Sequence, residues 1–434
     1  MQTKAKEKIN IVTLGCAKNL VDSEVLMTQL KGNKKDVFHQ REDINPDIVI
    51  INTCGFIDKA KQESIDTILK HAKEKEDGII KKLYVTGCLS ERYKDDLKTD
   101  IPEVDGFYGT RDLPELLKNF EAKYRNELLG DRIITTDSHY AYLKISEGCD
   151  RPCSFCAIPL MRGRHISKPI DQIILEAKNL IRNGVREIML IAQDSTYYGI
   201  DIYKKRAMSK LLKKLSDVEG LDWIRIHYAY PAGFPMDIIE VMRERDNICN
   251  YLDIPLQHGS TKMLKVMKRG ITREKTDELI KNIRDINPEI ALRTTLIAGH
   301  PGETERDFQE MYDFVERSQF DRLGIFTYSH EEGTSAHKLE DDVPEQVKRS
   351  RSNQIMALQQ KISTEKNKSK VGKTVKVLID RVDANNYYGR TEQDSPEVDN
   401  EVIIPSKEMH LRVGDFYDVK ITDSKEYDLI GKVY

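Results

Sequence analysis

The sequence predicts an α/β protein in three parts: an N-terminal parallel α/β sheet, a central partial (β/α)6 barrel of the TIM type, and a small antiparallel β-barrel at the C-terminus. Three observations predict this. Apolar strands alternate with amphipathic helices at the start of the chain. The strand–helix unit then recurs about six times. The last stretch alternates apolar and polar residues between turn signals. We expect the domains to be residues 1–125, 135–368 and 371–434.

Composition limits the possible functions. Hydrophobic residues make up 39% of the 434 residues, which is enough for a buried core and excludes wholesale disorder. Lys and Arg number 69 and Asp and Glu number 72, which gives a net charge of −3. The chain as a whole therefore lacks the excess of basic residues that is typical of nucleic-acid-binding proteins. No apolar run approaches the ~20 residues of a membrane span. The polar, lysine-rich start lacks the apolar core of a signal peptide, so we expect a cytoplasmic protein with no membrane partner.

The N-terminal strands are expected at residues 9–14, 47–51 and 83–86, with helices at 23–30 and 59–73. A charged, helical stretch at residues 111–132 marks the exit from this domain.

The central strands are expected at residues 142–146, 187–192, 223–228, 251–255, 291–297 and 323–328. The helices between them include residues 170–183, 272–285 and 304–316, the last beginning at a capping box of Thr304 and Asp307. Six units favour an open, incomplete barrel over the closed eight-unit form, and a doubly wound sheet is the alternative.

A later helix is expected at residues 344–368, with Pro344 in its first turn. Its apolar stripe of Ile355, Leu358 and Ile362 should pack on the barrel.

Three cysteines lie within eight residues, in Cys149-Asp-Arg-Pro-Cys153-Ser-Phe-Cys156. One loop at the rim of the barrel can fold all three thiolates onto one face of a metal cluster. Only three ligands are supplied, so one iron would keep an open position for a substrate or cofactor. The alternative is a zinc site with a fourth ligand such as His165. Phe155 is either a shield against water or simply core.

Three more cysteines, Cys16, Cys54 and Cys88, each follow an expected strand and each stand beside a glycine. The carboxyl ends of parallel strands share one edge, so these thiols could converge. We predict a second iron–sulfur cluster with three protein ligands. The seventh cysteine, Cys249, lies at the start of a buried strand and is expected to be inert.

The Cys-x3-Cys-x2-Cys loop after the first barrel strand resembles the radical S-adenosylmethionine superfamily, and two three-cysteine sites in this order resemble its methylthiotransferase family. The resemblance spans nearly the whole chain and includes a C-terminal barrel of the type called TRAM. The matching motifs are Gly15-Cys16-Ala-Lys-Asn-Leu-Val-Asp-Ser-Glu24, Asn52-Thr53-Cys54-Gly55-Phe56, Gly148 to Pro159, Asp253-Ile-Pro-Leu-Gln-His258 and Asp394-Ser-Pro-Glu-Val-Asp399. Together they are similar to the RimO branch, which modifies an aspartate in ribosomal protein S twelve. One departure is His300, where the family usually has phenylalanine.

The resemblance implies two 4Fe-4S clusters and S-adenosyl-L-methionine, whose amino and carboxylate groups bind the open iron of the Cys149/Cys153/Cys156 cluster. One S-adenosylmethionine would methylate a sulfur at the N-terminal cluster. A second would be cleaved to an adenosyl radical that takes hydrogen from the aspartate β-carbon, which then captures the methylthio group. The partners implied are ribosomal protein S twelve or the small ribosomal subunit, a reducing electron donor and a sulfur source.

Candidates for holding S-adenosylmethionine are Gln193, Gln257 and Arg293 at the ends of barrel strands, with structural hydrogen bonding as the equal alternative. The histidines expected to be core or rim residues are His227, His258 and His330.

The C-terminal barrel bears on the substrate. Residues 371–434 hold nine Lys and Arg and thirteen Asp and Glu, a net charge of −4, whereas an RNA-binding module should be basic. An acidic group of Glu392, Asp394, Glu397, Asp399 and Glu401 suits a basic partner such as a ribosomal protein, or is an ordinary solvated loop. The alternative functions are a tRNA methylthiotransferase acting on N6-isopentenyl- or threonylcarbamoyl-adenosine and a zinc-stabilised ribosome-binding factor.

Overall fold

The structure is a computed structural model that describes residues 7–406 and 410–433. Its N-terminal part is a five-stranded parallel sheet in the order β2-β1-β3-β4-β5. The strands are β1 (Lys8–Thr13), β2 (Asp36–His39), β3 (Ile48–Thr53), β4 (Lys82–Gly87) and β5 (Gly106–Phe107). The helices are α1 (Ala17–Gly32), α2 (Asp58–Glu76), α3 (Cys88–Asp100) and α4 (Leu113–Lys118). The three expected strands are confirmed, and the sequence analysis missed the short edge strands β2 and β5.

The central part is a six-stranded parallel sheet whose strands follow one another in chain order. They are β6 (Tyr140–Lys144), β9 (Glu187–Ile191), β10 (Trp223–Ile226), β11 (Ile248–Asp253), β12 (Ala291–Ala298) and β13 (Arg322–Thr327). A doubly wound sheet would reverse its strand order at a switch point, and this one does not. The partial barrel is therefore confirmed.

Helices cover the outer face of this barrel and bury the largest apolar cluster of the chain against it. They are α6 (Ile170–Arg182), α8 (Met208–Ser216), α9 (Asp237–Glu244), α11 (Arg273–Ile286), α12 (Glu305–Ser318) and α13 (Glu345–Lys368). The expected capping box of Thr304 and Asp307 opens α12, and Pro344 caps α13 rather than lying inside it. Smaller elements are β7 (Ser146–Glu147), α5 (Ile158–Arg162), β8 (Ile166–Ser167), α7 (Ile200–Tyr203) and α10 (Thr261–Val266).

The C-terminal part is a closed barrel in the order β14-β15-β16-β18-β17. Its strands are β14 (Thr374–Val382), β15 (Asn386–Arg390), β16 (Val402–Pro405), β17 (Phe416–Ser424) and β18 (Leu429–Val433). The pairing is antiparallel except between β16 and β18, which run parallel.

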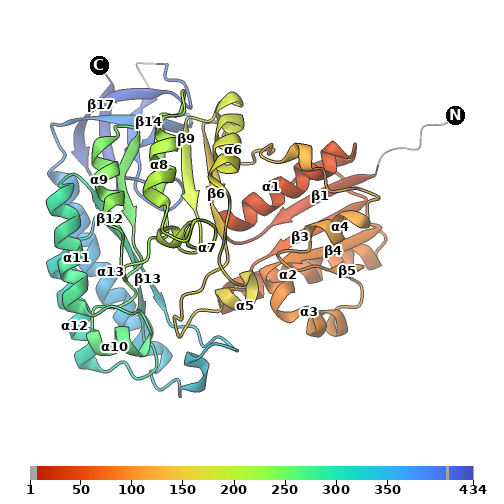
Figure 1. Ribbon diagram of the computed structural model, residues 1–434, viewed down its shortest axis with the longest axis horizontal. Coiled ribbons are helices and arrows are strands. Elements are labelled where there is room, and N and C mark those ends of the chain that lie inside the picture. The colour runs from red at the N-terminus through yellow and green to blue at the C-terminus, as the bar shows by residue number, and fades with distance from the viewer. Residues whose placement is uncertain (1–6, 407–409, 434) are drawn as a thin grey trace.

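The three parts pack against one another. Figure 1 shows the N-terminal sheet (red to orange) on one side of the central domain, with the short helix α5 between them, and the C-terminal barrel (blue) at one end of the central sheet. The start of α1 packs on the barrel, because Ala17, Leu20 and Val21 join an apolar cluster with Tyr142 and Ile191. A second contact is polar: the buried Glu331 pairs with Lys61 and Arg92 of the N-terminal part.

The loop of residues 391–400 between β15 and β16, here called the plug loop, docks on the amino ends of the central strands. Asp394 pairs with Arg322, the first residue of β13. Asp399 pairs with Arg293 in the first half of β12, at 3.3 Å. Glu397 accepts a hydrogen bond from the hydroxyl of Tyr140, the first residue of β6, at 3.1 Å. The loop therefore closes the barrel at the amino ends of its strands, which in barrels of this type contribute to stability, whereas active sites lie at the carboxyl ends.

This docking contradicts the expectation of an acidic surface open to a basic partner. Asp394 is 2% exposed, and the Asp399 side chain is equally buried in its ion pair. Glu392 accepts hydrogen bonds from Asn250 of β11, and Glu401 pairs with Arg381 of the same small barrel. Asp394 and Asp399 thus face inward and are neutralised by arginines, whereas Glu397 remains exposed. Among the described helices, none combines the length and the apolar character needed to cross a membrane.

Candidate active site

The three dispersed cysteines lie at neighbouring strand ends, as expected. Cys16 caps α1, Cys54 directly follows β3, and Cys88 is the first residue of α3 after β4. Gly15 has a φ of +91°, and a Cβ added to it would lie 2.7 Å from Cys54 Cβ and 2.9 Å from its sulfur. Only glycine therefore permits the turn that brings Cys16 and Cys54 together. The structure brings all three thiols to one edge of the N-terminal sheet.

The charges around these cysteines differ. Burial raises the pKa of the Cys88 thiol to about 12, and the neighbouring Cys16 and Cys54 raise it further. Burial also raises the pKa of Cys54. Cys16 is open to solvent on one side while protein surrounds its sulfur on the others. That packing opposes ionisation, but the charges of Lys18 and Arg162 outweigh it and lower the pKa of Cys16.

The central cysteines lie in the loop between β7 and α5. Gly148, with a φ of +78°, opens this loop, and a Cβ on it would lie 2.0 Å from the Arg164 carbonyl oxygen. Burial raises the pKa of Cys149 to about 11 and that of Cys156 to about 12, and Cys153 raises both. A coordinated cation would reverse this effect, because it deprotonates the thiols that bind it.

A buried guanidinium touches this second group of cysteines. Nη1 of Arg269 donates a hydrogen bond to the sulfur of Cys153 at 3.1 Å, and its Nη2 donates to the Pro255 carbonyl at 2.6 Å. Arg269 also lies over the ring of Tyr230, 4.3 Å from its centroid. Among the described residues, the guanidinium of Arg269 therefore contacts a cysteine sulfur and forms no ion pair with a carboxylate.

A polar network joins the two groups of cysteines. Arg162, at the end of α5, donates to Asp22 of α1 at 2.6 Å, to Glu147 at 3.2 Å and to the side-chain oxygen of Asn19. Asn19 lies 3.7 Å from the sulfur of Cys88, and Glu147 lies two residues before Cys149. Cys88 also packs on Ala157 and Met161, which directly follow the central cysteines. The two sets of thiols therefore face each other across α5.

The three residues expected to hold S-adenosylmethionine have different surroundings. Gln193 donates to Glu147 at 2.9 Å, while its buried carbonyl oxygen has no donor among the described residues. Gln257 has a φ of +77°, and its side-chain amide makes no hydrogen bond with the part of the chain that the structure describes. Strained backbone of this kind clusters at functional sites.

Arg293 differs from both, because it lies in the first half of β12 and not at its carboxyl end. Its guanidinium pairs with Asp253 at 3.2 Å and with Asp399 of the plug loop. These partners give it a structural role at the closed end of the barrel.

The histidines make hydrogen bonds or ring contacts with other side chains of the protein. His165 hydrogen bonds to Ser167 at 2.9 Å and packs on Tyr197, so it does not join the central cysteines. The buried His227 and His258 are hydrogen bonded to Ser395 and Glu303, and His330 stacks on His337. The unusual His300 is fully buried, with Nε2 3.3 Å from Ser154 Oγ and its ring in edge contact with Phe155. Cys249 is buried within β11, as expected.

Within residues 7–406 and 410–433, no three His, Cys, Asp or Glu side chains converge closely enough to hold a single metal ion. A four-iron cluster needs wider spacing than a single ion, because each thiolate binds a different iron.

Three basic residues of the candidate site could not be identified from sequence: Lys18, Arg162 and Arg269. Each is a basic residue near a cysteine in space. Lys18 alone is also near one in sequence, two residues after Cys16. The partners of Arg162 lie up to 143 residues away, so no local pattern indicates them.

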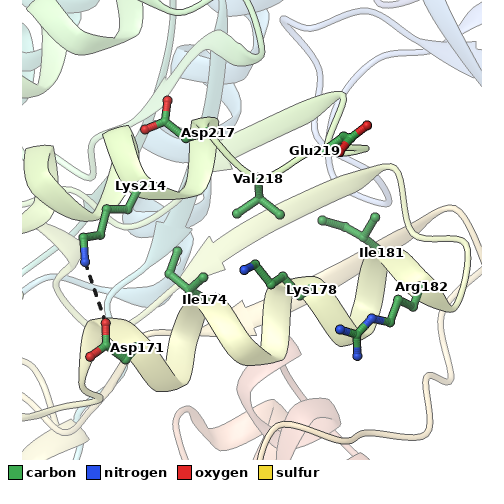
Figure 2. Close-up of a pocket in the computed structure, with 9 residues that line it drawn as sticks. All are labelled: Asp171, Ile174, Lys178, Ile181, Arg182, Lys214, Asp217, Val218 and Glu219. Carbon is green, nitrogen blue, oxygen red and sulfur yellow. Dashed lines mark ion pairs between the residues drawn. The ribbon is translucent and has the colours of Figure 1, made fainter.

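A surface hollow lies elsewhere, between α6 and α8 on the outer face of the barrel. Figure 2 shows its lining, which mixes apolar residues such as Ile174 with the ion pair of Asp171 and Lys214, whose charged atoms are 3.7 Å apart. None of the cysteines lines it. The chemistry is therefore not located in this hollow.

Comparison with known proteins identifies the three parts. The family model for the Radical SAM superfamily matches residues 143–315, that for uncharacterized protein family UPF0004 matches residues 8–109, and that for the TRAM domain matches residues 371–433. The radical S-adenosylmethionine methyltransferase TsrM from Kitasatospora setae shares the fold, with a TM-score of 0.56 and 14% identity over 74% of this chain and 75% of that one.

Full-length relatives are far more similar. The chain is 59% identical over 428 residues to a protein of Cytophaga hutchinsonii, covering 99% of this chain and 98% of the relative, and 53% identical to one of Bacteroides fragilis, covering 99% of each. Both relatives are named ribosomal protein uS12 methylthiotransferase RimO. The family expected from the two three-cysteine motifs is confirmed. The chain belongs to the RimO family of radical SAM methylthiotransferases.

Proposed function

We propose that this enzyme adds a methylthio group to the β-carbon of an aspartate in ribosomal protein uS12, using S-adenosyl-L-methionine and two 4Fe-4S clusters. The observation that carries the proposal is the arrangement of two groups of three thiols, which converge separately and face each other across α5. The similarity of the whole chain to proteins named as uS12 methylthiotransferases supports the same reaction.

The residues present fit two clusters. Thiolates are the usual ligands of iron–sulfur clusters, and each group supplies three. We assign Cys16, Cys54 and Cys88 to one cluster and Cys149, Cys153 and Cys156 to the other. The glycine turn at Gly15 leaves no room for any other side chain beside Cys54.

The protein also fits the cofactor. The buried carbonyl oxygen of Gln193 lacks a donor, and S-adenosylmethionine carries amino and hydroxyl donors. The free amide of Gln257 lies at the same carboxyl end of the barrel. We assign Gln193 and Gln257 to the cofactor, and propose no such role for Arg293 because both of its carboxylate partners belong to the folded chain.

S-adenosylmethionine at a reduced cluster supplies homolytic chemistry, which an aspartate C–H bond needs because it has no useful acidity. The remaining work belongs to the protein. Arg162 and its partners hold the two thiol groups at a fixed separation, and the packing of α1 on the barrel excludes water from the space between them. The electrons and the transferred sulfur come from a reducing donor and a sulfur source outside the chain, and the substrate is uS12, free or within the small subunit.

The test is anaerobic reconstitution of three variants beside the wild type. Changing Cys16, Cys54 and Cys88 together to Ala should halve the bound iron, and changing Cys149, Cys153 and Cys156 together should do the same. Cys249→Ala is the matched control and should keep all the iron. Loss of all iron in either triple variant, or zinc in place of iron, would contradict two independent clusters.

Activity is followed by mass spectrometry of uS12 and, separately, of tRNA. The wild type should add one methylthio group to uS12, and both triple variants should add none. Transfer to tRNA in place of uS12 would overturn the proposed substrate and leave the cluster assignment intact.

A further inference from the structure

Lys18 is a buried cation with no anionic partner among the residues that the structure describes. It lies in the first turn of α1, two residues after Cys16, and is 8% exposed. Its ammonium sits 3.4 Å from the centroid of the Tyr228 ring. Within the described residues it makes no other side-chain hydrogen bond or ion pair. An ammonium carries three donors, and little of this side chain reaches water, so the position suits an acceptor from outside the chain.

The neighbouring cations do not share this property. Lys144 and Arg162 lie close by, and they share the carboxylates of Asp22 and Glu147, two cations with two anions. Lys18 is the surplus positive charge at this junction.

Its location places that charge between the two groups of thiols. On one side, Lys18 lies in the first turn of α1, whose N-cap residue is Cys16. On the other side, Tyr228 lies two residues beyond the carboxyl end of β10, in the left-handed region with a φ of +62°. Lys18 therefore spans from the N-terminal thiols to the rim of the barrel, where the central cysteines also lie.

We infer that Lys18 binds the side-chain carboxylate of the target aspartate. This rests on the proposed function. The resemblance to radical SAM enzymes implies that the carboxylate of S-adenosylmethionine is taken by the open iron of the central cluster, which leaves Lys18 to another carboxylate. Within a protein substrate, the remaining carboxylate at the site is the one on the residue to be modified. The aspartate β-carbon is bonded directly to its carboxyl carbon, so an ammonium that holds the carboxylate fixes the reacting carbon to within one bond.

This arrangement also makes Lys18 a specificity-determining residue. A charge-assisted hydrogen bond favours aspartate over asparagine, which has the same shape and no charge. Removing one partner of a buried charge pair costs about 2 kcal/mol or more, which is about 30-fold in affinity.

The test measures binding rather than turnover. Reconstituted enzyme is titrated with labelled uS12 and with uS12 whose target aspartate is replaced by asparagine. The wild type should bind the aspartate form about 30-fold more tightly, and Lys18→Met should bind both forms equally, at the affinity of the wild type for asparagine. Lys18→Arg should restore most of the preference. Lys31→Met, at the exposed end of the same helix, is the matched control and should keep it in full.

Two outcomes overturn the inference. In the first, Lys18→Met keeps the preference for aspartate. In the second, it loses half its iron, which would show that Lys18 serves the N-terminal cluster. Failure of the proposed function has a different signature, since the wild type would then transfer no methylthio group to uS12.

Discussion

The ion pair between Asp394 of the plug loop and Arg322 should contribute a measurable part of the free energy that holds the C-terminal barrel on the central one. Asp394 accepts hydrogen bonds from Arg322 Nε at 2.9 Å and from the Thr391 hydroxyl at 2.6 Å. Arg322 is 7% exposed, so Asp394→Ala would leave its guanidinium buried without its ion-pair partner. Breaking a buried pair from one side costs about 3–5 kcal/mol. That is a large part of the roughly 5–15 kcal/mol that stabilises a typical domain.

The fluorescence of a native tryptophan can be used to measure this loss of stability. The chain's single tryptophan, Trp223 of β10, packs edge to face on Phe416 of β17, with ring centroids 4.7 Å apart. Tryptophan fluorescence therefore reports directly on the contact between the two barrels. In a urea titration followed by fluorescence, Asp394→Ala should lower the free energy of unfolding by about 3 kcal/mol, and far-ultraviolet dichroism should show whether the central barrel unfolds with it.

Two further variants test whether an unpaired buried charge causes the loss of stability in Asp394→Ala. Asp418→Ala removes an exposed carboxylate of β17 that has no partner within the described residues, and should change stability by less than about 0.5 kcal/mol. Replacing both members of the pair, with Arg322→Met and Asp394→Leu together, should recover most of the stability because no charge is left buried. A loss below about 1 kcal/mol in Asp394→Ala would refute the reasoning.

The same pair gives a pH dependence. Burial opposes ionisation of Asp394, but Arg322 and Lys370 outweigh it and lower its pKa below that of the unfolded chain. A lowered folded pKa stabilises the protein above the unfolded value of about 3.9, and this contribution is lost as the pH falls through the folded pKa. The fluorescence transition of the wild type should therefore weaken below about pH 4, and that of Asp394→Ala should weaken less.

Two further predictions concern the clusters. Arg269→Met removes a positive charge and a hydrogen bond from Cys153. The reduction potential of the central cluster should therefore become more negative in a redox titration followed by electron paramagnetic resonance. An unchanged potential would contradict a contact between Arg269 and the cluster ligand. Gly15→Ala places a methyl group against Cys54 and should reduce iron towards half. Gly78→Ala, which has a similar positive φ but open space around it, should leave iron unchanged, and equal losses in both would attribute the effect to backbone strain alone.

The sequence predicted elements well where local pattern decides them. All six central strands and the helices around them follow from apolar runs between turn signals, and α12 follows from Thr304 and Asp307. The strands β2 and β5 were missed because they are short and lie at the sheet edges, where little apolar sequence is needed. The convergence of Cys16, Cys54 and Cys88 was predictable, because the topology of a parallel sheet brings equivalent strand ends together.

Electrostatic partners could not be predicted in the same way. The plug loop reads as an acidic surface because sequence shows the spacing of its carboxylates and not the direction in which they face. Its partner Arg322 lies 72 residues before Asp394, and that of Asp399 lies 106 residues before it. Arg162 is a similar case, since it is an ordinary basic residue of a short helix until Asn19 and Asp22 are brought against it.

The contacts between the N-terminal sheet and the barrel explain why directional polar bonds are used at this junction. Apolar packing alone would hold α1 on the barrel but would tolerate sliding, whereas hydrogen bonds lose strength steeply when their geometry changes. Arg162 fixes the junction at the thiols, and Glu331, bound by Lys61 and Arg92, fixes it at a second place. Two such points define both the separation and the orientation of the sheet relative to the barrel. The proposed transfer of a group from one set of thiols to a carbon held near the other needs both to be constant, so in that proposal these buried charges serve the geometry of the transfer as well as the stability of the fold.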